Sequence, residues 1–110
     1  MAYNQENAER VRQALTGLAV EEKRMFGSLG FMVNSKLALC VKEHDMMFKL
    51  SQNDYNEALA DNSARPMIHA NRIMKQWVFV ENDKLEDPVS FGKWLKAALK
   101  YNQIVKQTSE

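Results

Sequence analysis

Hydrophobic side chains recur every three to four residues in three parts of the chain, a spacing that places them on one side of a helix. The first part predicts a helix over about Asn4–Leu18. The second predicts a short helix through residue 60, which Ser51 can cap with its hydroxyl. The third predicts a helix over about 88–101, with Asp87 as its cap and a proline in its first position.

Between these helices, hydrophobic and polar side chains alternate, which is typical of half-buried strands. The expected strands are Glu22–Phe26, Gly30–Val33, Leu37–Lys42, Met46–Leu50, Pro66–His69 and Met74–Val80. Asn34 and Ser35 are expected to form a hairpin turn. The connections before about Leu50 are too short for crossover helices. The pattern therefore predicts an α+β fold, an antiparallel sheet meander with flanking helices in the order α-β-β-β-β-α-β-β-α.

Composition limits the class of protein further. The chain has 110 residues, of which 45% are hydrophobic and 26% are charged, so we expect one domain over 1–110 with its core at about 4–101 and a frayed tail at 102–110. Its longest apolar run, Leu37–Val41, is too short to span a membrane. Cys40 is the single cysteine, which excludes a disulfide scaffold, and the first residues lack a signal-peptide pattern. We therefore expect a cytoplasmic protein without a membrane partner.

Charge gives weak support for a polyanion partner, because the formal net charge is only +1. Two stretches are nevertheless rich in cations and free of acids. Together they form a candidate anion or nucleic-acid surface: Arg65, Arg72, Lys75, Lys93, Lys96 and Lys100. Such a surface requires both groups to lie on one side of the fold. The three lysines of the last helix can equally be its solvated face.

Residues that could support catalysis or bind a metal are few. Cys40, His44 and His69 lack the spacing of a zinc motif, so we expect no metal and no cofactor. Cys40 lies within an apolar strand, where a thiol behaves as a small hydrophobe with a raised pKa. The paired carboxylates fall at helix junctions, and the stretch Gly27–Gly30 lacks the lysine of a phosphate-binding loop. These observations indicate no catalytic residue and no enzyme.

The chain contains seven methionines, and methionine surfaces can repack around different partners. Met25, Met32, Met46 and Met47 lie in expected strands, where core filling is the simpler role. Trp77 and Trp94 are likewise expected in the core or covering the sheet.

Two segments far apart in the chain carry a recognisable motif. The first contains Arg-Met-Phe-Gly followed by Gly-Phe-Met-Val, and the second contains Met-Lys-x-Trp-Val-x-Val. The motif residues are Arg24, Met25, Phe26, Gly27, Gly30, Met74 and Trp77. In combination they resemble the TfoX amino-terminal domain family over roughly Ala14–Tyr101. The chain departs from the family at Ser28, Ser35 and Asn71–Met74, where the family has turn glycines and a Gly-Arg/Lys-Pro-Met segment; these departures concern turn chemistry.

The resemblance implies an α+β domain with an antiparallel sheet and brings no catalytic residue. The namesake regulates competence genes and joins this domain to a carboxy-terminal one, for which we expect no room here, so a competence role is not carried over. We expect a non-enzymatic regulatory or protein-interaction module with a protein partner. Two alternatives stay open, a nucleic-acid-binding domain and a small-ligand protein or enzyme with a pocket between sheet and helices. Free sheet edges would allow a homodimer.

Overall fold

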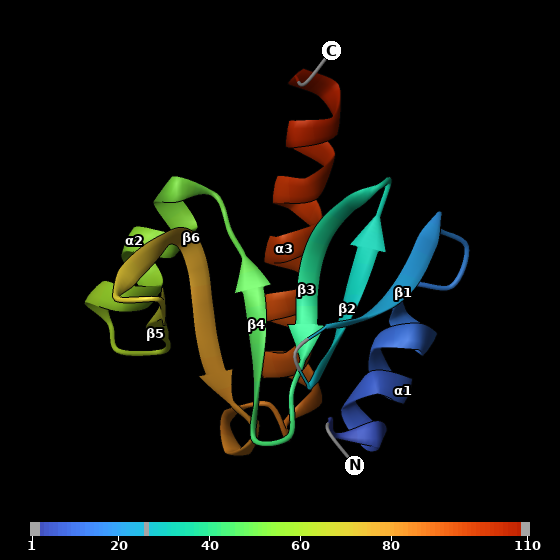
Figure 1. The fold of residues 1–110 in the computed structure, drawn as a ribbon, viewed down its shortest axis with the longest axis horizontal. Helices are drawn as coiled ribbons and strands as arrows, with labels where there is room; N and C mark the ends of the chain where they lie inside the picture. The colour runs from blue at the N-terminus through green and yellow to red at the C-terminus, as the bar shows by residue number, and fades with distance from the viewer. Residues whose placement is uncertain (1–2, 26, 109–110) are drawn as a thin grey trace.

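The computed structural model describes residues 3–25 and 27–108 (Figure 1). The strands are β1 (Val20–Met25), β2 (Ser28–Val33), β3 (Lys36–Val41), β4 (Asp45–Lys49), β5 (Arg65–His69) and β6 (Arg72–Glu81). The helices are α1 (Gln5–Ala14), α2 (Gln52–Ala60) and α3 (Pro88–Thr108), with a 3-10 turn η1 (Asn82–Lys84) before α3. The α+β class and the element order predicted from the sequence are confirmed.

Each helix begins where the sequence supplies a capping side chain. Asn4, Ser51 and Asp87 each accept a hydrogen bond from the backbone amide three residues further on, at 2.8, 3.1 and 2.9 Å respectively. Such bonds satisfy amides that have no partner inside the helix and contribute about 1 kcal/mol each. The caps expected at Ser51 and Asp87 are therefore confirmed.

The helix ends differ from the sequence prediction in two places. α1 stops at Ala14 rather than near Leu18, and Gly17 then adopts a φ of 93°, which no right-handed helix contains. In contrast, α3 continues past Tyr101 to Thr108. Its extension keeps packing on the sheet, because Asn102 is buried and its side-chain amide donates a hydrogen bond to the backbone oxygen of Val33 at 3.0 Å.

The six strands form one antiparallel sheet in the order β1-β2-β3-β4-β6-β5. The first four are consecutive hairpins, and the turn expected at Asn34 and Ser35 is confirmed by φ values of 54° and 68°. After β4 the chain forms α2 and returns as the edge strand β5. A second tight turn at Ala70 and Asn71 then places β6 between β4 and β5.

All three helices bury their apolar sides against the same face of the sheet. In Figure 1, α3 crosses behind the central strands. The core cluster joins side chains from every helix to those of the sheet, including Val11 of α1, Ala58 of α2 and Trp94 of α3. At its centre the rings of Phe48 and Trp94 stack with centroids 5.8 Å apart. The fold is thus two layers, helices on one side and strands on the other.

Candidate interaction surface

Neighbouring residues of β4 serve opposite faces of the sheet. Met46 and Phe48 are fully buried in the core beneath the helices. Met47 lies between them and pairs with Phe79 of β6, so these two side chains project from the other face. Within residues 3–25 and 27–108 no helix covers that second face, which is the one turned toward the viewer in Figure 1. We call it the outer face.

The outer face is hollowed by a groove of about 280 Å³, here called the outer groove. Side chains from all six strands line it, and most of them are apolar. They are Met25, Ser28, Leu37, Cys40, Lys42, Met47, Met67, His69, Met74 and Trp77. The groove therefore crosses the whole sheet, and at its centre Cys40 and Met47 lie on strands that are paired on both sides.

Gly30 of β2 explains how the groove walls come together. A Cβ atom at this position would lie 2.9 Å from both Leu37 Cδ1 and Met25 Cε. The missing side chain lets residues of β1 and β3 meet above β2. Gly30 thus marks a close approach within a strand, and the approaching atoms belong to side chains.

The methionines divide between core and groove. Met46 fills the core, as expected. Met25, in contrast, is half-buried on the outer groove, and Met47 is buried at the same groove outside the core cluster. Trp94 lies in the core, whereas Trp77 lines the groove. The alternation of β4 could have separated Met46 from Met47, but the sequence could not reveal which face the helices leave uncovered.

The two motif segments meet at the outer groove. Met25 comes from the first segment, Met74 and Trp77 come from the second, and all three line the groove. Gly30 lies between the groove walls, and Gly27 turns the chain from β1 to β2 with a φ of 77°. Of the remaining motif residues, Arg24 projects over the ring of Tyr3 at 5.7 Å, and Phe26 lies outside the described residues.

One cation that lines the groove and two that lie near it are placed over aromatic rings. Lys42 and Arg65 approach the ring of Phe79, at 5.6 and 5.4 Å from its centroid. Lys49 lies 5.6 Å from the centroid of Trp77, and partial burial lowers the pKa of its ammonium group. Such contacts hold the aliphatic stems along the apolar surface with the charged ends at its margin. Lys42 and Lys49 could not be identified from the sequence, because pairing across the sheet, rather than a spacing along the chain, brings each one to its aromatic ring; Lys49 lies directly opposite Trp77.

Cys40 is 1% exposed, and burial raises the pKa of its thiol from about 9 to about 11. Because the thiolate is the nucleophile, we expect alkylation by iodoacetamide at pH 8 to be about 100-fold slower in the folded protein than in denaturant. The folded state holds this proton more tightly than the unfolded state. Its contribution to stability is therefore present below pH 9 and is lost as the pH rises through 11. Equal alkylation rates would contradict this environment; mass spectrometry of the labelled chain provides the readout.

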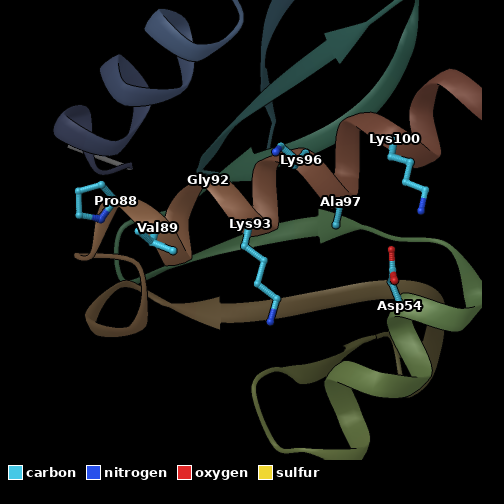
Figure 2. Close-up of a pocket in the computed structure, with 8 residues that line it drawn as sticks. All are labelled: Asp54, Pro88, Val89, Gly92, Lys93, Lys96, Ala97 and Lys100. Atoms are coloured by element: carbon cyan, nitrogen blue, oxygen red, sulfur yellow. The ribbon is translucent and has the colours of Figure 1, made fainter.

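The six candidate cations do not form one surface. Lys93, Lys96 and Lys100 are exposed on α3, beside a hollow of about 540 Å³ between α2 and α3. Figure 2 shows Lys93 and Lys100 extending on the side where Asp54 of α2 lies. Arg65, in contrast, lies on the outer face, where its guanidinium group pairs with Asp45 at 3.4 Å.

The other two cations follow β6. Arg72 pairs with His69, a groove residue, and Lys75 is exposed in a stretch of β6 that a register shift leaves without a β5 partner. Nucleic-acid binding by all six cations together lacks the shared face that it requires. Binding by the lysines of α3 stays a prediction.

Groups suited to metal binding do not gather in the part of the chain that the structure describes. No three His, Cys, Asp or Glu side chains among these residues could hold one ion. His44 is exposed in the β3–β4 turn beside Glu43. None of the described helices is both long enough and apolar enough to cross a membrane.

In a comparison with protein families, residues 13–101 match the TfoX N-terminal domain. Among curated proteins and among solved structures, no match was found. The matched range contains every strand of the sheet and all residues that line the outer groove.

Proposed function

Because the chain belongs to the TfoX N-terminal domain family, we propose that it is a non-enzymatic regulatory or protein-interaction module whose partner docks on the outer groove. The observation that carries this proposal is the meeting of the two motif segments there. Met25 and Gly30 arrive from β1 and β2, while Met74 and Trp77 arrive from β6. Core packing does not require these residues on the face that lacks helices.

The chemistry of the groove suits a protein segment. A sheet face with a hydrophobic floor gains free energy when a second layer covers it. Methionine is unbranched and flexible, so a methionine-lined groove can adapt to the side chains placed in it. A volume of about 280 Å³ lies just below the range of small-molecule pockets, roughly 300–1,000 Å³. The groove therefore suits a few apolar side chains of a partner better than a whole cofactor.

A peptide selection tests this proposal. We would display random peptides of roughly 16 residues, about four helical turns, and select for binding to the folded domain. Peptides that also bind a Met47→Lys variant, which places a charge at the groove, would be removed from the selected pool. We expect enriched peptides to bind the wild-type domain at least about tenfold more tightly than the variant, because a buried cation without a partner opposes docking.

Two controls keep the selection decisive. Met74→Lys changes a half-buried groove residue, so it reports on the groove even if Met47→Lys fails to fold. Lys96→Met places methionine on exposed α3, and we expect it to leave peptide binding unchanged. Circular dichroism checks that each variant is folded. If no peptide distinguishes the open groove from the blocked one, the proposal is wrong.

The alternative function is nucleic-acid binding by the exposed lysines of α3. Three phosphate contacts would give a slope of roughly −2.7 for log K against log salt. Fluorescence anisotropy with labelled single- and double-stranded DNA at about 50 and 200 mM salt measures this slope. Tight, salt-sensitive binding that Lys93→Glu and Lys100→Glu abolish would favour this alternative over the groove.

A further inference from the structure

We infer that the partner segment in the outer groove is an acidic amphipathic helix from another protein; this inference rests on the proposed function. The groove combines an apolar floor with a cationic margin, and its centre lies on β3 and β4, whose backbones already pair on both sides. Charge, location and symmetry each narrow the choice of occupant.

Charge favours an acidic segment. None of the described residues that line the groove is an aspartate or a glutamate, whereas Lys42 lines it directly. Lys49 lies over Trp77, and neither lysine has a carboxylate within 4.0 Å among the described residues. Arg65, on the far side of Phe79, has one such partner, Asp45. Carboxylates of a docked segment could therefore pair with Lys42 and Lys49 without displacing an existing partner.

The location of the groove favours a helix over a strand. An extended peptide joins a sheet through the free backbone groups of an edge strand. The groove reaches the edge strands at its ends, but its central residues Cys40 and Met47 lie on β3 and β4, which are paired on both sides. Over these central strands a partner can contribute only side chains. An amphipathic helix projects apolar side chains at positions i, i+3, i+4 and i+7 from one side while satisfying its own backbone hydrogen bonds.

Symmetry disfavours a second copy of this chain. In a two-fold contact the same surface of both subunits would meet. The cationic margins of both copies would then be buried in one contact, with no carboxylate among the described lining residues to pair with them, and juxtaposed like charges are unfavourable. An acidic segment from a different protein avoids this repulsion.

The peptides enriched on the open groove test the inference. We expect them to carry an excess of Asp and Glu and to repeat apolar residues with helical spacing. Synthetic copies are then compared with two matched versions, one with every acid replaced by lysine and one with a proline in the central turn. We expect both changes to weaken binding at least about tenfold.

A charge-reversal variant of the domain tests the same point from the other side. The double substitution Lys42→Glu and Lys49→Glu is expected to weaken binding of the acidic peptide by at least about tenfold and to strengthen binding of the lysine version. The matched control is Lys93→Glu with Lys100→Glu on α3, which conserves the total charge change but lies away from the groove. This control should leave the preference unchanged.

The outcomes separate the inference from the proposed function. If the enriched groove-dependent peptides are neutral or basic, docking on the groove stands but the acidic character of the partner is wrong. If their apolar residues alternate with period two, docking stands but the helical conformation is wrong. If the proline in the central turn of the peptide does not change its affinity, the helical conformation of the partner is also wrong. Self-association that Met47→Lys abolishes, measured by sedimentation, would assign the groove to a second copy instead. If no groove-dependent peptide is enriched, both the proposed function and the inference fail.

Discussion

Replacing Phe48 by alanine is expected to destabilise the domain by about 3–5 kcal/mol, the range for removing a large buried aromatic side chain. Phe48 is fully buried, stacks on Trp94 of α3 and pairs with Leu39 and Val78 of the neighbouring strands. The cavity would therefore open at the contact between the two layers. A loss of this size is a large part of the total stability of a small domain. Urea denaturation followed by circular dichroism measures it.

Phe79→Ala is the matched control for this substitution. Phe79 is a half-buried phenylalanine of β6 that projects from the outer face, opposite Met47. Because no helix packs on that side among the described residues, we expect a loss below about 2 kcal/mol. If both substitutions destabilised the domain equally, the helix-covered face would not be the main core.

Asn102→Ala is expected to destabilise the domain by about 1–3 kcal/mol, the cost of leaving a buried backbone acceptor without its partner. Asn102 is 4% exposed, and its amide donates to the oxygen of Val33 at the end of β2. Its side-chain oxygen also accepts a hydrogen bond from the side-chain amide of Asn34 at 3.4 Å. This residue attaches the later turns of α3 to the β2–β3 turn.

The stability change and the local change can be measured separately. Urea denaturation reports the free energy of unfolding, and hydrogen exchange of the amides at 103–105 reports whether the end of α3 opens. Gln103→Ala alters the next, exposed residue and should change stability by no more than about 0.5 kcal/mol. A loss for Asn102→Ala as small as this would show that the contact with Val33 does not hold the helix end.

Much of the fold could be predicted because local chemistry and tertiary packing agree there. Ser51 and Asp87 cap the helices that follow them, and Asn34 tolerates the positive φ that the hairpin requires. The last turns of α3 could not be predicted, because a polar residue such as Asn102 gives no sign that the helix continues; only its contact with Val33 shows this. Tertiary contact, rather than helical periodicity, supports the continuation of that helix past Tyr101.

The candidate site was harder to predict than the fold. Period-two alternation separates Met46 from Met47, but it does not say which face the helices cover. Hydrophobic periodicity also does not reveal the register shifts on β3 and β6. In β6 the shift includes Gln76, which has a φ of 71°. The motif identified Met25, Gly30, Met74 and Trp77 without indicating that they meet. Pairing across the sheet is the information that the sequence lacks.

Because adjacent residues of β4 serve opposite faces, the same strand supports the helices on one side and offers a surface to a partner on the other. Exchanges at Met47 or Lys49 alter the surface offered to a partner, while Met46 and Phe48 continue to hold the helices on the sheet. We therefore expect conservative exchanges on the outer face to change which segments bind while the helices stay packed on the sheet. The one-sided arrangement of the helices is what allows recognition to change separately from core packing.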